Sequence, residues 1–258
     1  MGALVKRLST SELDCLRDGK RLNDLVINKW LELLGSRNRH TIFCGRPTRI
    51  TNYDIALINS NFFKSCSGRT FPKWSMVPLV RWCKYCIIPI HDEGREHWYL
   101  AILHLESSTI YFLDSLGRHL HQETVVGVFT KCLGTQIQST FLEGSTQTNG
   151  SDCSIYLLHA VVSFVRDPRE WLNNPAERKL HNSKRFREVI FRELSSLPPA
   201  KDVVMGDAGQ VRKRKQQQQM VVSTPPGRVE MGGSRKLLDE LRSYYVECDE
   251  SIFSAMKY

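Results

Sequence analysis

Residues 147–165 read QTNGSDCSIYLLHAVVSFV, and this stretch decides the fold. From residue 155 onward the sequence is apolar nearly all round, which predicts a helix buried on every side instead of an amphipathic surface helix. Cys153 falls in the first turn of that helix, where free backbone N–H groups and the positive end of the dipole favour a thiolate. Asp152 and Ser151 are typical cap residues for its start. The stretch therefore predicts either a reactive cysteine or a cysteine packed as a small apolar residue.

A cysteine nucleophile needs a base, and the base needs a group that orients it. Residues 97–117 read HWYLAILHLESSTIYFLDSLG and predict a hairpin, with strands over 98–105 and 109–113 joined by a short polar turn. The start of the first strand then lies beside the end of the second. His97 and Asp114 are therefore expected opposite or diagonal to each other. If the loop has two or four residues, the numbers of any two directly paired residues add up to an odd number. The sum of 97 and 114 is also odd, so the side chains of His97 and Asp114 point to the same face of the hairpin.

A third polar group precedes the cysteine. Gln147 lies six residues before Cys153 in a polar loop that contains glycine. Its side-chain amide can donate to a developing oxyanion together with the backbone N–H of Cys153, which is the arrangement that acyl transfer requires. Alone, each of these residues also fits an ordinary strand edge, turn or loop. Together they predict nucleophilic catalysis.

With these residues in view, the chain resembles the Ulp1/sentrin-specific family of cysteine proteases, which process and remove SUMO and related modifiers. The resemblance covers about residues 8–195 and rests on LNDLVINKWLELL at 22–34, on HWYLAI with the later FLDSLG, and on QTNGSDCSIYLL. The order His, Asp, Cys along the chain also matches the family. The resemblance implies an α+β fold of the papain-like, Ulp1 type. A central mixed sheet would pack on a buried helix that carries the nucleophile, with flanking helices.

The resemblance also implies roles for individual residues. Cys153 would be the nucleophile, His97 the general base and acid, Asp114 the orienting carboxylate and Gln147 the oxyanion donor. Trp98 would cover a narrow tunnel that holds the Gly-Gly tail of the modifier. Such a tunnel gives specificity because it excludes side chains.

The N-terminal part of the resemblance concerns substrate binding. Asn23 and Asp24 match the motif where the family places modifier contacts. Two positions depart from the family pattern: Arg21 replaces a tryptophan on the other side of the tunnel, and Ser154 replaces the usual glycine after the nucleophile. Arginine can cover a tunnel with its planar head and aliphatic stem, so Arg21 joins the expected substrate-binding residues. The identity of the modifier stays open.

The expected reaction is cleavage after the C-terminal Gly-Gly of SUMO or a related ubiquitin-like modifier, in precursor processing, deconjugation or both. A NEDD8- or ubiquitin-directed hydrolase of the same fold is one alternative, and a low-activity modifier-binding protein is another. No cofactor or metal is expected. The lone pair Cys83 and Cys86 lacks a second pair at zinc-binding spacing.

Composition changes after Leu197. Residues 1–197 are predicted to form the protease domain, 198–235 a flexible basic, Gln- and Pro-rich linker, and 236–258 a C-terminal helical tail. Within the domain, helical spacing and cap residues predict helices over 11–17, 23–35, 53–63 and 185–194, and strands over 86–113 and 136–141.

Charge and cysteine content restrict the partners and the compartment. The formal net charge of +9 favours an acidic partner, for which a SUMO-type modifier is the first candidate. The domain has no nucleic-acid-binding signature, so nucleic acid is expected only at the basic run that follows it, Arg212 to Lys215, which also fits a nuclear import signal. Eight scattered cysteines, no secretory signal and no stretch able to cross a membrane predict an intracellular monomer, in the nucleus or the cytoplasm.

Overall fold

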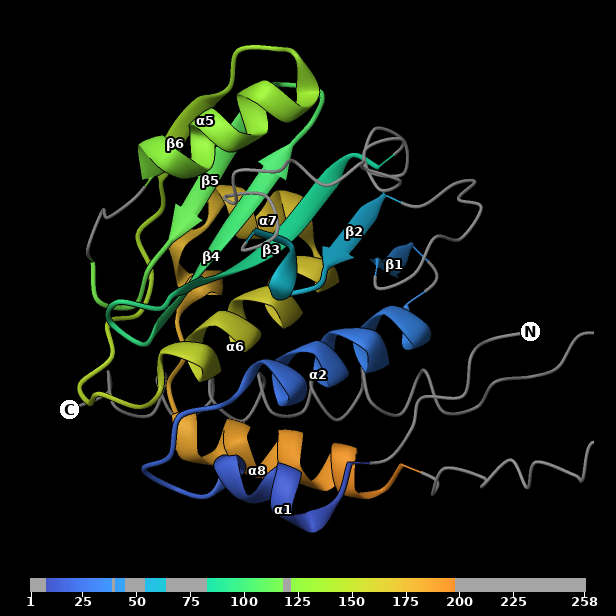
Figure 1. Ribbon diagram of the computed structural model, residues 1–258, viewed down its shortest axis with the longest axis vertical. Helices are drawn as coiled ribbons and strands as arrows, with labels where there is room; N and C mark the ends of the chain where they lie inside the picture. Colours follow the sequence, from blue (N-terminus) through green and yellow to red (C-terminus); the bar gives the residue numbers. More distant parts are fainter. Residues whose placement is uncertain (1–7, 39, 45–53, 64–82, 118–121, 198–258) are drawn as a thin grey trace, which may run out of the picture. The chain divides into compact units, whose positions relative to one another are not determined.

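The computed structural model describes residues 8–38, 40–44, 54–63, 83–117 and 122–197. The expected linker, 198–235, and the expected tail, 236–258, lie outside the described residues. A six-stranded sheet forms the centre of the described part, and strands that follow one another in sequence are neighbours in space (Figure 1). The strands are β1 (Thr41–Cys44), β2 (Ile55–Ile58), β3 (Tyr85–Asp92), β4 (His97–His104), β5 (Thr109–Leu113) and β6 (Gln138–Phe141).

The sheet is mixed, as expected. The pairs β1–β2, β2–β3 and β5–β6 are parallel, whereas β3–β4 and β4–β5 are antiparallel. In the β4–β5 hairpin Leu100 pairs with Leu113, so paired residue numbers sum to an odd number as predicted. This register puts Asp114 diagonal to His97 on the same face of the hairpin.

The helix that begins at the cysteine is buried. It is α6 (Cys153–Arg166), and every residue from Leu157 to Val165 lies in the interior. It packs against β4 and is flanked by α2 (Asp24–Arg37), α7 (Pro168–Asn173) and α8 (Ser183–Ser195). The predicted buried helix is therefore confirmed.

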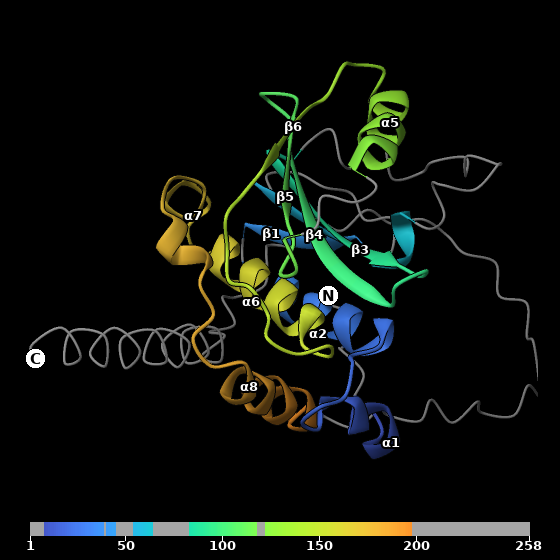
Figure 2. The ribbon, with the colours of Figure 1, turned by 90° about the vertical axis from the view of Figure 1, so that its left-hand side faces the viewer.

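The other face of the sheet is covered by α5 (Gln122–Leu133), as Figure 2 shows. Val125 and Phe129 of this helix belong to a hydrophobic core with side chains of β2, β3, β4 and β5. Helices thus cover both faces, which explains why β3 and β4 are almost continuously apolar. The side chains of β4 and β5 in this core position the hairpin, at whose end His97 and Asp114 lie.

The N-terminal elements begin with α1 (Thr10–Leu13), which starts with a capping box between Ser9 and Glu12, and continue through the short 3₁₀ helix η1 (Asp14–Leu16). Another 3₁₀ helix, η2 (Pro175–Arg178), separates α7 from α8. Contacts of η1 with α8 hold the N-terminal segment against the domain (Figure 1).

One predicted helix is wrong. The described part of this range, 54–63, contains β2, whose four residues are all buried between β1 and β3, and only 61–63 are helical. A short apolar run that is buried on both faces cannot be distinguished from a buried helix by its periodicity. Among the described helices, none combines the length and the apolar character that a membrane-crossing segment requires.

Candidate active site

Cys153 is the first residue of α6 and follows directly on the loop 147–152. The backbone N–H groups of Ile155 and Tyr156 donate to the carbonyl of Asp152 over 2.8 and 3.1 Å and close the first turn. The residue is only 1% exposed, and it lines a small cavity of about 10 Å³. The helix end favours an anion at this position.

His97 begins β4 and Asp114 follows β5. The Nε2 atom of His97 lies 2.7 Å from Oδ1 of Asp114. The backbone N–H of Leu116 donates to the same oxygen over 2.8 Å, so the turn itself holds the carboxylate in place. The contact predicted from the hairpin is present, and it leaves Nδ1 of the imidazole for Cys153.

The surroundings of His97 favour its charged form. Burial by itself lowers the pKa of the imidazole, because the charged ring loses hydration. Hydrogen bonds to Asp114 and to Cys153 outweigh that effect and raise the pKa from 6.5 to about 9. At neutral pH the ring is therefore an imidazolium between a carboxylate and the sulfur, which is the state that stabilises a thiolate.

We expect the imidazole of His97 to titrate near pH 9, and Asp114→Asn to lower this midpoint because it removes the carboxylate charge. Because folding raises the pKa from 6.5, the stability that the protonated ring contributes is complete below pH 6.5 and is lost as pH rises through about 9. NMR titration of the ring resonances measures the midpoint. A wild-type midpoint at or below 6.5 contradicts this electrostatic description.

Gln147 is buried in the loop before the nucleophile. Its Oε1 accepts a hydrogen bond from the hydroxyl of Ser115 over 2.6 Å, and its Nε2 donates to the carbonyl of Asn149 over 2.7 Å. A primary amide has two N–H donors, and the second is the one that an oxyanion can use. The structure fixes this side chain beside the helix start, and its role as oxyanion donor stays a prediction.

Trp98 lies between two cavities and lines both. One is a groove of about 580 Å³ that Asn23 and Asp24 also line. The other has a volume of about 10 Å³, is lined by Cys153 and is about the size of one water molecule. His91 stacks on the indole with ring centroids 4.4 Å apart and supports it. Trp98 thus borders both the open groove and the small cavity beside Cys153, and its role as the cover of a tunnel stays a prediction.

Arg21 connects the two sides of the site. Its Nε donates to the carbonyl of Gly150 in the nucleophile loop over 3.0 Å. Its guanidinium also forms an ion pair with Glu96, the residue before His97. The exposed Arg21 side chain therefore spans the space between the cysteine loop and the histidine strand.

Asn23 and Asp24 lie at the start of α2. The Oδ1 atom of Asn23 accepts from the backbone N–H of Val26 over 2.9 Å and caps the helix. Asp24 is exposed in the first turn and lines the groove beside Trp98. Sequence reasoning assigned both residues to substrate contacts, and the structure adds a structural role for Asn23.

The structure describes three further cysteine side chains, Cys15, Cys83 and Cys86. Like Cys153, they form no disulfide. Burial raises the pKa of Cys15, and it raises the pKa of Cys83 to about 11, so both thiols are neutral at physiological pH. The described residues contain no group of three or more His, Cys, Asp or Glu side chains placed to hold a metal ion.

The sequence between residues 20 and 194 matches the sequence profile of the Ulp1 protease family, C-terminal catalytic domain. The match covers well over half of the chain and includes every residue of the site described above. The chain belongs to the Ulp1 protease family. The expected family and the α+β fold are therefore confirmed.

Individual proteins resemble this chain in sequence or in fold. Human sentrin-specific protease 2 is 24% identical over 210 residues, which cover 74% of this chain and 33% of that protein. A solved de-sumoylating protease superposes with a TM-score of 0.57 at 17% identity, over 74% of this chain and 86% of that one. The effector XopD of Xanthomonas campestris, solved bound to ubiquitin, gives 0.52 at 16% identity, over 72% and 97%. The chain spans about a third of the length of the curated relatives it matches.

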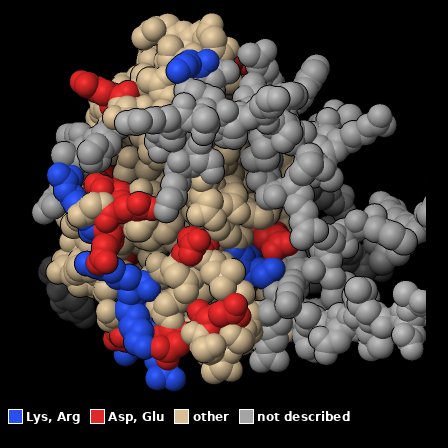
Figure 3. Space-filling model, in the orientation of Figure 1, with Lys and Arg blue, Asp and Glu red and all other residues tan. Residues whose placement is uncertain are grey.

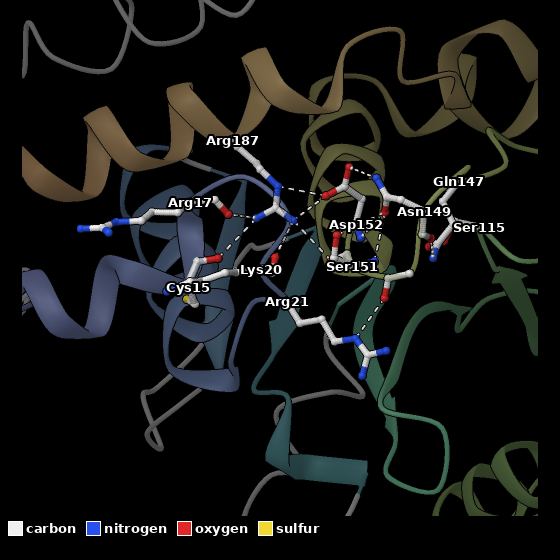
Figure 4. A network of polar contacts seen from close by, with 11 residues as sticks. Cys15, Arg17, Lys20, Arg21, Ser115, Gln147, Asn149, Ser151, Asp152 and Arg187 are labelled. Carbon is white, nitrogen blue, oxygen red and sulfur yellow. Dashed lines mark hydrogen bonds and ion pairs between the residues drawn. The ribbon is translucent and has the colours of Figure 1, made fainter.

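Sequence reasoning missed part of the polar network in this Ulp1-family domain. Asp152 occupies the N-cap position of α6, but its side chain makes no cap hydrogen bond, so the predicted capping role is wrong. The carboxylate instead pairs with Arg187 of α8 and accepts from Asn149 (Figure 4). Burial raises the pKa of Asp152, but hydrogen bonds from Asn149 and Arg187 hold it below its ordinary value. The signal in the sequence was Arg187, an arginine that falls on the same face of α8 as the apolar residues Ile190 and Leu194.

Proposed function

We propose that this domain is a thiol isopeptidase that cleaves after the C-terminal Gly-Gly of SUMO or a related ubiquitin-like modifier. The observation that supports it most is the line of contacts from Asp114 through His97 to Cys153. A nucleophile, a base and an orienting group in this order are what acyl transfer through a thioester requires.

In the proposed reaction the thiolate of Cys153 attacks the carbonyl carbon of the terminal glycine. The carbonyl oxygen becomes an oxyanion, which accepts from Nε2 of Gln147 and from the backbone N–H of Cys153. The imidazolium of His97 gives its proton to the leaving amine, and the C–N bond breaks to leave a thioester. His97 then takes a proton from water, whose oxygen attacks the thioester. The C–S bond then breaks, which releases the modifier carboxylate and a proton and restores the thiolate of Cys153 beside the imidazolium of His97.

The closed surroundings of the sulfur favour a glycine substrate. Cys153 lines a cavity of only about 10 Å³, and Trp98 lines both this cavity and the larger groove. A peptide bearing side chains at the cleavage point would collide with the indole, whereas two glycines present only backbone. Exclusion of side chains therefore supplies the selectivity for a Gly-Gly tail.

SUMO is the first candidate for the modifier, because the names of several relatives refer to sentrin or to de-sumoylation. Ubiquitin or NEDD8 is the second candidate. The fold neighbour solved with ubiquitin and the presence of Arg21 beside the site favour it. A modifier-binding protein with low activity is the third candidate, but it would not require a histidine held in its charged form beside a cysteine.

Cleavage assays test the proposal. SUMO, NEDD8 and ubiquitin would each be offered with a C-terminal peptide extension, to detect processing, and joined to a lysine side chain, to detect deconjugation. We expect hydrolysis of at least one SUMO substrate and none by Cys153→Ser. Turnover of ubiquitin or NEDD8 alone would support the second candidate. No turnover of any substrate, together with measurable modifier binding, would support the third.

Arg21→Trp is expected to change the preference among modifiers by about tenfold, because it replaces a charged cover that is bonded to Glu96 and Gly150 by an apolar one. The ratio of kcat/KM for SUMO and ubiquitin substrates measures the preference. Glu96→Gln, which weakens the same ion pair without adding bulk, is the matched variant. An unchanged ratio in Arg21→Trp would show that this side chain does not contact the bound tail.

The proposed partner is an acidic modifier, bound by a monomer. On the face in Figure 3, acidic and basic side chains of the described residues are interspersed along one edge instead of forming a patch of one sign. Such a surface fits a specific protein partner better than nucleic acid. We therefore propose nucleic-acid binding only for the basic run Arg212 to Lys215. The same run supports a nuclear location, because it fits an import signal.

A further inference from the structure

The most heavily bonded side chain near the nucleophile belongs to Arg187, which the reaction above does not use. It lies on α8 and is 2% exposed. Its Nε donates to Oδ1 of Asp152 over 2.9 Å, and a second guanidinium nitrogen pairs with the same oxygen. The guanidinium also donates to four backbone carbonyls, those of Lys20 at 2.7 Å, Cys15 at 3.3 Å, Ser151 at 3.3 Å and Arg17 at 3.5 Å. It therefore joins the N-terminal segment to the loop that carries Cys153 (Figure 4).

From Asp152 the contacts continue toward the proposed oxyanion donor. Nδ2 of Asn149 donates to Oδ2 of Asp152 over 2.9 Å, and Oδ1 of Asn149 accepts from the backbone N–H groups of Ser151 and Asp152. The carbonyl of Asn149 accepts from Nε2 of Gln147, and Oε1 of Gln147 accepts from Ser115. One uninterrupted chain of hydrogen bonds thus runs from α8 to the residue after Asp114.

This series of hydrogen bonds reaches both expected oxyanion donors and restricts the direction of each. Asp152 is covalently joined to Cys153, so its position sets the backbone N–H of the nucleophile. The carbonyl of Asn149 takes one hydrogen of the Gln147 amide, which fixes the plane of that amide and hence the direction of the other hydrogen. Donors must lie within a narrow range of the oxyanion, and misplacement by about 1 Å can cost about 100-fold in rate.

We propose that Arg187 and Asp152 form a buried ion pair that positions the oxyanion donors, Gln147 and the backbone N–H of Cys153. The inference rests on the proposed function, because it assigns a purpose to this pair within the same reaction. Stability alone does not explain the pair, since apolar residues of similar volume commonly replace a buried ion pair without loss. Neither residue touches the substrate, and both act through the nucleophile loop.

Asp152→Asn is the mildest test, because asparagine keeps the shape and one acceptor oxygen for Arg187, but it lacks the charge and the second oxygen that accepts from Asn149. We expect kcat on a modifier substrate to fall by about 10- to 100-fold with KM nearly unchanged. Glu193→Gln is the matched control. It also replaces a carboxylate of an ion pair by an amide. Glu193 lies on α8 away from the nucleophile, where it pairs with Arg37 over 2.7 Å, so this change should leave kcat unchanged.

A double-mutant cycle separates positioning from simple destabilisation. Because the pair positions Gln147 as well as the backbone N–H of Cys153, Asp152→Asn should cost less kcat in the Gln147→Ala variant, where one of the two donors is already absent, than in the wild-type protein. Losses that multiply in the double variant would overturn the proposal. A kcat per folded molecule that equals the wild-type value in Asp152→Asn would overturn it as well.

A second readout does not need activity. Hydrogen exchange of peptides that span residues 147–154 should become about tenfold faster in Asp152→Asn, because the backbone N–H bonds to Asn149 loosen. Glu193→Gln should leave this exchange unchanged. Unchanged exchange in Asp152→Asn refutes the positioning role. If the loop loosens but the wild-type protein cleaves no modifier, the proposed function fails and the structural coupling stands.

Discussion

Replacing His97 with alanine is expected to lower kcat by about four orders of magnitude or more. The substitution removes both the imidazolium that stabilises the thiolate of Cys153 and the acid that protonates the leaving amine. The raised pKa of His97, about 9, shows how strongly the site favours that charge. Single-turnover and steady-state cleavage of a modifier substrate would measure the loss.

Two controls separate chemistry from folding in this experiment. His104→Ala changes the histidine at the opposite end of β4, where the ring stacks on Tyr85, and it should leave kcat unchanged. We expect His97→Ala to remain folded, because Asp114 keeps the hydrogen bond from the backbone N–H of Leu116. Circular dichroism would verify this. A folded His97→Ala protein whose kcat stays within about tenfold of wild type would rule out the imidazole as general acid and base.

Arg187→Met is expected to lower the free energy of unfolding at pH 7 by about 3–5 kcal/mol, a large share of the 5–15 kcal/mol that is typical of a domain. The change leaves the carboxylate of Asp152, 4% exposed, without its cation, and it removes the donor to four carbonyls. Urea unfolding monitored by tryptophan fluorescence would measure the loss. The double variant Arg187→Met with Asp152→Leu should regain the part of the unfolding free energy that Arg187→Met loses through the unpaired carboxylate.

The pH dependence of Arg187→Met has a definite sign. In the wild-type protein the pKa of Asp152 lies below its ordinary value of 3.8, so the pair stabilises the fold above that pH and is lost as pH falls through the lowered pKa. The deficit of Arg187→Met should therefore be largest near neutral pH and shrink in acid. Glu193→Gln, at a more exposed pair, should cost about 1 kcal/mol or less. A similar small loss in Arg187→Met would mean that the buried pair contributes little.

The hairpin and the central helix were predictable because their signals are local. The parity of residue numbers across a short loop requires only the loop length, and it placed His97 and Asp114 on one face as the register shows. The helix from Cys153 onward was recognisable because no surface helix is apolar on every side. The pattern that identifies each element lies within one stretch of sequence, 97–117 for the hairpin and 147–165 for the helix.

Other parts depend on contacts between distant residues, which periodicity does not encode. The strand β2 was mistaken for a helix because its burial comes from β1 and β3, not from its own pattern. Arg187 lies 35 residues from Asp152 and 167 from Lys20, so no local motif links them. Asp152 was assigned to helix capping because that role is the common one for aspartate before a helix, and the tertiary ion pair prevailed.

Covalent capture tests the identity of the nucleophile and of its substrate at once. SUMO, NEDD8 and ubiquitin would each carry a thiol-reactive group at the C-terminus, and peptide mapping by mass spectrometry would locate any adduct. We predict that the SUMO probe forms one adduct, at Cys153, and that Cys153→Ala forms none. Failure of all three probes to react, or an adduct at Cys15 that persists in Cys153→Ala, would contradict a modifier-directed cysteine peptidase with this site.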